Sequence, residues 1–476
     1  MSSIVAIVLE ALTSNDSIIS AESQMMTELS QLVCAGVAQA CEQLDDDLCL
    51  GHKDYRIIHK DQRHITAMFG DVVFKQRLVK DDSGRLFYPF DEKVGLATGR
   101  RFTPMIMAKV AELASFTVMR TTAKAVDLLT PFSMSAMTVD NLVREAGQEL
   151  DTVREAEAKY VTVEVDRRAV PQLFIEGDAF EVKLKHGTQV MVHRVQISEG
   201  ATQSGKRHQL INRHSITGLS HEKVFDEARS YIDQHYDLRE TCVLTGSDNG
   251  SGYSPKAFKE LVPGAARWAH VLDGYHLNRK LKERFSMMPR DLQDLLRKSV
   301  WTGNKARTEM VLDTAESMVQ DTDSGDSMRS EWLDNLTKLR RYLDRNWPYI
   351  EALSNRQLDR RGLGSCESNH RRYTYRTKLQ GRSWTRSGLI AELRIIDALQ
   401  NDDYLSSLEA TAFLETQIKP EVKTTLRSLQ LFGPAPTTHQ GAYQGRIALY
   451  GASSSDIGRW IPLSGNAMAV RASSLA

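Results

Sequence analysis

Three acidic side chains stand where a folded sheet could bring their carboxylates together. Asp178 lies in the middle of the run LFIEGDAFEV, Asp248 ends the run VLTGSD, and Glu367 lies near the start of a helix-like segment in GSCESNHRRYTYR. Converging carboxylates repel one another, and a hard divalent cation that prefers oxygen ligands relieves that repulsion. Two Mg²⁺ ions held there, with Mn²⁺ as a substitute, can activate a water or a 3′-hydroxyl at a phosphodiester and stabilise the leaving oxygen.

Each acid also has a plainer interpretation. Asp178 could face solvent on an edge strand, and Asp248 could form a turn or cap a helix. Glu367 could be a first-turn carboxylate that the helix dipole favours. The acids are weak signals one by one, and only the ordered set on a matching fold favours a metal site.

Four neighbouring residues compete with or accompany this set. Asp273 follows another strand-like run and is the alternative second metal ligand. His276 lies one helical turn further on and is interpreted as a residue that positions DNA or packs the helix, with metal binding as the alternative. Asp166 competes with Asp178 but lacks an apolar run before it. Glu392 competes with Glu367, lies beside the apolar stripe of its helix and is expected to be solvated.

The segments around the acids predict the order β-β-β-α-β-α-β-α. The first strand carries Asp178, the fourth ends at Asp248, and a later helix carries Glu367. This is the order of an RNase H-like fold, in which the first and fourth strands are neighbours. The alternation of helices and strands in its second half favours parallel pairing.

The predicted fold class is α/β (α+β overall): an RNase H-like catalytic core with a large helical insertion, preceded by a small β meander and a helical DNA-binding region. Within the pre-core helices, segments 121–129 and 135–149 flank a turn at Pro131. They predict either a helix-turn-helix or plain helical packing. The expected units are an N-terminal helical region (1–60), the meander (61–92), the pre-core helices (93–160), the first segment of the core (161–286), the insertion (287–360), the second segment of the core with the glutamate helix (361–430) and a Gly/Ser-rich tail (431–476).

The charge of the chain is balanced in total but polarised along the sequence. It carries 61 basic and 61 acidic residues, which counts against a protein coated in nucleic acid. Residues 1–60 are acidic, whereas 371–394 are strongly basic. Trp384 in that stretch could stack a base or serve as a hydrophobic anchor. The candidate DNA-binding residues are Arg371, Arg372, Arg376, Lys378, Arg382, Trp384 and Arg386.

Two absences from the sequence bound the class of protein further. No run approaches the roughly 20 apolar residues that a membrane helix needs. The five cysteines include no CxxC pair, which is typical of a reducing cytoplasm.

The segment GSDNGSGYSPKAFKELVPGAARWAHVLDGYHLNRKLK resembles bacterial insertion-sequence transposases of the ISLre-two family, which are similar in turn to Mutator-like DDE transposases. LFIEGDAFEVK resembles the strand of the first catalytic aspartate in that family, and SCESNHRRYTYRTKLQGRSWTRSGLIAELR resembles its glutamate region. The likeness covers most of the chain. Where relatives usually show a glycine–aspartate–glycine loop before a tryptophan, this chain has Ser247-Asp248-Asn249-Gly250 and Tyr253.

The resemblance implies a DDE transposase, with Asp178, Asp248 and Glu367 as the catalytic, metal-binding acids. Such an enzyme cleaves the DNA ends of its element in a Mg²⁺-dependent reaction and transfers the strands to target DNA. The implied partners are the terminal inverted repeats, target DNA and further copies of the chain in a homo-oligomer, with no membrane. The implied location is the bacterial cytoplasm, associated with the nucleoid. The alternatives are a non-catalytic, domesticated DNA-binding protein and another RNase H-like nuclease.

Overall fold

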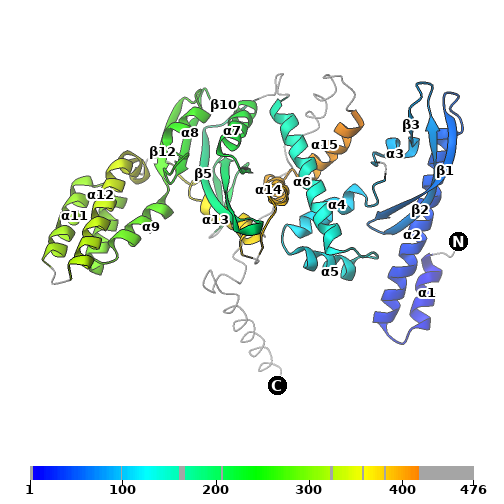
Figure 1. Cartoon of the computed structure of the whole chain (residues 1–476), viewed down its shortest axis with the longest axis horizontal. Coiled ribbons are helices and arrows are strands. Elements are labelled where there is room, and N and C mark those ends of the chain that lie inside the picture. Colours follow the sequence, from blue (N-terminus) through cyan, green and yellow to red (C-terminus); the bar gives the residue numbers. More distant parts are fainter. Residues whose placement is uncertain are drawn as a thin grey trace.

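Five strands form one central sheet around which the helices are arranged (Figure 1). Asp166 and the expected tail 431–476 lie outside the residues that the structure describes, and so does the side chain of Glu367. The computed structural model describes residues 4–97, 99–159, 167–204, 207–321, 325–355, 359–379 and 382–417.

The central sheet combines an antiparallel half with a parallel half. β5 lies in its middle and pairs antiparallel with β6, which pairs antiparallel with β9. On the other side of β5, β11 and β12 run parallel to it. In spatial order the strands are β12 (Arg267–Leu272), β11 (Cys242–Ser247), β5 (Gln172–Lys183), β6 (Gln189–Ser198) and β9 (His214–Gly218).

The connections between the strands explain why one half of the sheet is antiparallel and the other half is parallel. A tight turn, η1 (Lys185–Gly187), joins β5 to β6, and such a short link permits only antiparallel pairing. Parallel neighbours need a crossover, which α8 (Pro255–Leu261) supplies between β11 and β12. α7 (His221–His235) leads from β9 toward β11. Two separate two-stranded sheets accompany the central one. They pair β7 (Ala201–Ser204) with β8 (Arg207–Leu210), and β4 (Arg168–Ala169) with β10 (Tyr236–Asp237).

The alternation of side chains along β5 sends its residues to two different layers. Leu173 and Ile175 pack in a core with α7 and α8. Phe174 packs instead with the helices that follow β12, and Phe180 packs against α13 (Cys366–Thr377) and α14 (Arg386–Asn401). Asp178 is an even number of residues from Phe174 and from Phe180, so its side chain lies on the same face of β5 and points to the α13 layer.

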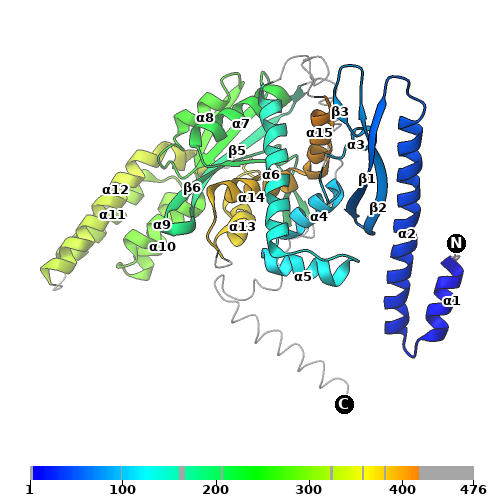
Figure 2. The same ribbon diagram turned by 45° about the vertical axis from the view of Figure 1, so that its right-hand side comes forward.

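The segment after β12 is helical, as predicted, and packs on the β12 side of the sheet. α12 contacts both β12 and α9, and a shared apolar core joins these helices to β11 and β12. Figure 2 shows this block extending away from the sheet. Its helices are α9 (Gly274–Phe285), α10 (Arg290–Trp301), α11 (Lys305–Gln320) and α12 (Asp326–Ser354).

A second helical layer surrounds α14. α6 crosses α14 so closely that a Cβ on Gly147 would lie 2.3 Å from Ala391 Cα, which explains the glycine. α6 also packs on α4, α5 and α15, so the second helix of the candidate helix-turn-helix is largely used in packing. The members of this layer are α4 (Pro104–Ala114), α5 (Met119–Leu129), α6 (Ala136–Lys159) and α15 (Tyr404–Gln417).

The N-terminal region pairs a helical hairpin with a small sheet. The meander forms with turns at Gly70 and at Asp81–Gly84, but it begins at Arg56, earlier than the sequence indicated. α2 packs along β2 through an apolar core that includes Phe74. The elements are α1 (Ile4–Ser14), α2 (Ile18–Cys49), β1 (Arg56–Ala67), β2 (Gly70–Lys80), β3 (Leu86–Phe87) and α3 (Pro89–Val94). Within the described residues, every helix is too short or too polar to cross a membrane.

Candidate functional site

Asp178 lies on the central strand of the sheet and beneath α13. β5 is flanked by β6 and β11, which excludes the edge-strand interpretation of this residue. Its carboxylate is partly buried, and Oδ2 lies 3.7 Å from His370 Nδ1 on α13. Burial lowers the pKa of His370 to about 2, so the imidazole is neutral and does not compensate the charge of Asp178.

Asp248 and Asp273 follow neighbouring parallel strands and therefore lie at the same edge of the sheet. The amide of Asp273 donates to the carbonyl of Ser247 over 2.8 Å, which joins the ends of β11 and β12. Asp248 accepts the Gly250 amide at 2.8 Å, as a turn-forming aspartate does. Asp273 is the N-cap of α9 and accepts the His276 amide at 2.9 Å.

His276 shows that the three aspartates share one neighbourhood. Its Nδ1 lies 3.4 Å from Asp273 Oδ1. The adjacent Asp273 carboxylate contributes most to raising the pKa of His276, and the negative charges of Asp178 and Asp248 raise it further against the effect of burial. Burial would raise the pKa of Asp273, but its bonds to His276 outweigh burial and lower it. Of the three carboxylates, Asp273 contacts the imidazole, and Asp178 and Asp248 are near enough to favour its charged form.

Glu367 lies in the first turn of α13, directly after Cys366. The backbone of this turn is held against β5, because the Cys366 amide donates to Glu176 over 3.1 Å. The structure thus brings the backbone of Glu367 to the sheet layer that contains Asp178.

The donor chemistry of this edge fits a hard cation. Carboxylate oxygens are what Mg²⁺ prefers, and a divalent charge would offset the shared negative field. Among the side chains that the structure describes, however, no three His, Cys, Asp or Glu are arranged to hold a metal ion. A complete set of ligands would therefore require a further acid such as Glu367.

A cavity of about 920 Å³ adjoins this edge on the side of the helical block. The residues that line it include Glu176, Asp273, Tyr275, Trp301 and Arg360. Trp301 is held by a hydrogen bond from its indole nitrogen to Asn278, 2.9 Å long.

Two of the arginines predicted to contact DNA instead make contacts within the protein. Arg376 is fully buried and pairs with Glu392 over 2.8 Å. Arg372 donates to the carbonyl and hydroxyl oxygens of Ser115 and lies over the ring of Phe116. Neither guanidinium is presented to a DNA backbone in this structure, because α13 packs against the end of α4.

The expectation that Glu392 is solvated is wrong. Its side chain is fully buried between α14 and α13. Burial raises the pKa of Glu392 to about 7, and Arg376 and Arg372 oppose this rise. α14 is buried on more than its apolar stripe, because α13 also covers the side of the helix where Glu392 lies.

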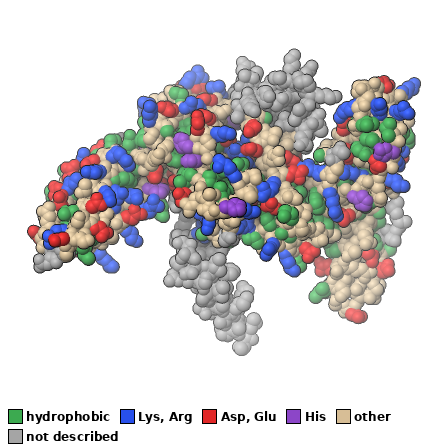
Figure 3. All heavy atoms as spheres, viewed as in Figure 1, with side chains coloured by type: hydrophobic (Ala, Val, Ile, Leu, Met, Phe, Trp, Pro, Cys, Tyr) green, Lys and Arg blue, Asp and Glu red, His purple; other side chains and the backbone are tan. Residues whose placement is uncertain are grey.

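Trp384 is a buried anchor between α13 and α14. Its indole nitrogen donates to the Thr377 carbonyl over 3.0 Å, and the Arg376 guanidinium lies over the ring. Lys378 and Arg386 are exposed in the same region of the molecule, and Arg371 and Arg382 are partly exposed. Figure 3 shows that Lys and Arg side chains are otherwise mixed with Asp and Glu over the visible face.

Sequence reasoning missed Glu176, Gln196 and Arg194, which support α13 from beneath. Glu176 lies two residues before Asp178, so strand alternation places both on one face. That signal was present in IEGDAF. Gln196 and Arg194 stand opposite Glu176 and Asp178 on β6, and only the observed register reveals this.

The fold and site define a mixed α/β protein with an acidic centre at the carboxyl ends of parallel strands. The chain belongs to the uncharacterised protein family UPF0236, whose model matches residues 13–409. It is 31% identical over 456 residues to a Streptococcus gallolyticus protein described as "UPF0236 protein in vanSb 3′ region", covering 92% of this chain and 96% of that one. A UPF0236 protein of Caldanaerobacter subterraneus subsp. tengcongensis is 23% identical over 343 residues, covering 71% of this chain and 68% of that one.

Among solved structures, the chain is similar to one titled "Drosophila P element transposase strand transfer complex". The TM-score is 0.31 and the identity is 10%, over 64% of this chain and 94% of that chain.

Proposed function

We propose that the protein is the DDE transposase of a bacterial insertion sequence, cutting the ends of its element and transferring them to target DNA in a Mg²⁺-dependent reaction. The observation that carries this proposal is how the sheet places three aspartates. Asp178 lies on β5 two residues after the stretch that pairs with β11, and Asp248 and Asp273 directly follow the parallel strands β11 and β12. Acids gathered in this way are suited to phosphodiester chemistry, in which divalent cations stabilise both the attacking and the leaving oxygen.

The topology of the sheet supports an RNase H-like core. Three antiparallel strands are followed by two parallel ones, with the first strand in the middle beside the fourth. In the proposed core, made of 161–286 and 361–430, the helical block 287–360 is the insertion. Asp178 and Asp248 would then hold the position of the first two acids of the DDE set, and Glu367 that of the third.

The chain's own residues would divide the work as follows. Asp178, Asp248 and Glu367 would hold the metal ions, with Asp273 as the alternative to Asp248. Two bound Mg²⁺ ions would supply Lewis acidity at the scissile phosphate. His276 and the neutral His370 would position the carboxylates. Lys378, Arg382 and Arg386, with Arg371, would contact the DNA backbone beside the acids.

Two further observations support a mobile element. The residues quoted above resemble the ISLre-two transposases over most of the chain. The name of the Caldanaerobacter relative joins eleven locus designations. One protein encoded at many loci of a genome is the distribution that a copied element leaves. Because transposition holds two DNA ends at once, we propose a homo-oligomer as the working form.

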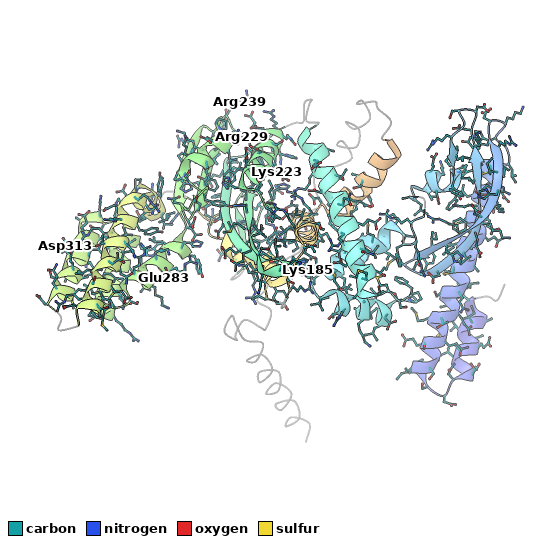
Figure 4. The ribbon with its side chains drawn as sticks, viewed as in Figure 1. Lys185, Lys223, Arg229, Arg239, Glu283 and Asp313 are labelled. Atoms are coloured by element: carbon teal, nitrogen blue, oxygen red, sulfur yellow. The ribbon has the colours of Figure 1, made fainter. Side chains whose placement is uncertain are left out.

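The test is cleavage of a labelled duplex that carries the terminal repeat of the element, with Mg²⁺ or Mn²⁺. We expect nicking at the repeat end by the wild type and loss of nicking in Asp178→Asn and in Glu367→Gln. Asp313→Asn is the matched control, since Asp313 is exposed on α11 and lies away from α13 (Figure 4). Full cleavage by Asp178→Asn would refute the assignment.

One observation favours a second candidate, a non-catalytic DNA-binding protein. Asp248 and Asp273 already form a turn and a helix cap, and the described side chains hold no ready metal group. This candidate predicts binding to the terminal repeat that survives loss of all three acids, without cleavage. Cleavage with no preference for the repeat would point instead to another RNase H-like nuclease.

A further inference from the structure

Glu176 is a buried carboxylate whose partners are mostly backbone amides. Its side chain is 5% exposed on the α13 face of β5, two residues before Asp178. Among the described residues, no Lys or Arg lies within ion-pair distance of it. A buried carboxylate is costly unless hydrogen bonds replace its hydration, so the groups that do this are informative.

The donors belong to the start of α13. Glu176 Oε1 accepts the Gly364 amide over 2.6 Å. Oε2 accepts the amides of Ser365 and Cys366 over 3.2 and 3.1 Å, and the Ser365 hydroxyl over 3.0 Å. These groups include orphan amides that every helix N-terminus leaves unsatisfied.

The residue that would ordinarily cap the helix does not do so. Ser365 is the N-cap of α13, yet its side chain makes no capping hydrogen bond to the helix. Its hydroxyl is instead directed to Glu176. The carboxylate of a central strand therefore takes the place of the cap, and it ties the helix to the sheet at the same time.

A second strand completes this attachment. Gln196, opposite Glu176 on β6, donates to Ser365 Oγ over 2.8 Å and accepts from Asn369 over 2.8 Å. Arg194, also on β6, donates to the Cys366 carbonyl over 3.0 Å. The loop before α13 lies against the same surface, since a Cβ on Gly362 would meet the Phe174 ring at 2.4 Å.

We infer that Glu176 is a positioning residue that fixes the first turn of α13, and with it Glu367, relative to Asp178. This inference rests on the proposed function. Glu176 does not need to bind metal for this role, because amides and a hydroxyl occupy both of its oxygens. A displacement of about 1 Å at a reacting group can cost roughly 10²-fold in rate, so the attachment of Glu367 to β5 would matter for the chemistry.

The experiment compares Glu176→Gln with Glu181→Gln, a control on the exposed face of the same strand. We expect Glu176→Gln to lower kcat for cleavage of the repeat at least about tenfold, with KM for DNA changed less than about twofold. Amide hydrogen exchange at 364–369 should become faster in Glu176→Gln only. Glu176→Asp keeps the charge but shortens the side chain, and it should lower kcat in the same sense if Glu176→Gln does not fold.

A local cap separates positioning from simple helix stabilisation. Ser365→Asp added to Glu176→Gln supplies a cap from within the helix but no attachment to β5. We expect it to restore thermal stability and to leave kcat low. Restoration of cleavage by Ser365→Asp, or wild-type kcat in Glu176→Gln, would overturn the inference.

Failure of the proposed function has a different signature. If the wild type does not cleave DNA with Mg²⁺, that function is lost. Hydrogen exchange at 364–369 then still decides whether Glu176 fixes the helix: unchanged exchange in Glu176→Gln would refute the attachment itself.

Discussion

Two clusters of acidic side chains differ in their partners: one is buried beside the C-terminal half of α13, and the other is half-buried after β11 and β12. Beside the C-terminal half, each acid has an arginine: Glu392 pairs with Arg376 over 2.8 Å, and Asp397 pairs with Arg154 over 2.9 Å. After β11 and β12, Asp248 and Asp273 have no Lys or Arg within ion-pair distance among the described residues. Backbone amides and His276 contact these two carboxylates instead.

This difference suggests two roles for the acids: those paired with arginine stabilise the fold, and those without a cation are available to bind a ligand. An acid paired with arginine is already compensated, and removing one member of the pair exposes the cost of burying the other. Acids that face one another without a cation keep a negative field that favours binding of a divalent ion. The following predictions test this contrast, from the largest expected effect to the smallest.

The two strand-end aspartates should differ as metal ligands. We expect Asp248→Asn to reduce cleavage roughly 10³-fold, because the second metal position loses charge, and Asp273→Asn to reduce it about tenfold. Asparagine still caps α9 at position 273, so both proteins should remain folded. Single-turnover cleavage measures the two rates. The reverse order of effects would make Asp273 the second ligand.

Arg376→Met should destabilise the protein by about 3–5 kcal/mol, because it leaves Glu392 buried without its main partner. The double variant Arg376→Met with Glu392→Met should regain most of this loss, since both buried charges are then gone. Urea unfolding followed by circular dichroism measures the free energies. Arg386→Met is the control, because Arg386 is exposed. An equal loss in the single and double variants would argue against the pair as the cause.

His270 should make the acidic edge sensitive to low pH. It is buried beneath the Asp248 turn, where Thr245 and Asn249 contact its ring nitrogens over 2.8 Å. Burial lowers the pKa of His270 to about 4, below its ordinary value near 6.5. The unfolded state therefore binds more protons between these values, and stability should fall as pH drops through that window, by roughly 2–3 kcal/mol in total.

The measurement for His270 is the free energy of unfolding at several pH values between 7 and about 4. His270→Gln keeps the shape and some hydrogen bonds but cannot titrate. Its stability should be lower at pH 7 and should fall less steeply in acid. Parallel curves for the variant and the wild type would contradict the assignment.

Mg²⁺ should stabilise the wild type by about 1 kcal/mol at a concentration several times its Kd, since the ion binds only the folded acidic cluster. This corresponds to a rise in Tm of about 1–2 °C. Asp178→Asn should abolish the rise, whereas Asp313→Asn should retain it. Differential scanning calorimetry with and without chelator measures the shift. An equal rise in both variants would place the ion elsewhere.

The sequence by itself determined the elements around the acidic edge. Strand-like runs before Asp178, Asp248 and Asp273 predicted the strands, and the intervening helical segments predicted their parallel half. The meander expected at 61–92 is also present, with turns at Gly70 and at Asp81–Gly84. These signals are local, because side-chain alternation, crossover length and turn chemistry depend on residues close together in the chain.

Only the tertiary structure decided which charges are buried and what they contact. Arg372 and Arg376 looked like a surface for DNA, and Glu392 like a solvated residue, until α13 packed against α4 and α14. Glu176 likewise became the cap of a helix that starts 190 residues later. The environment of a charged side chain is set by distant segments packed against it, and no local pattern records which segments those are.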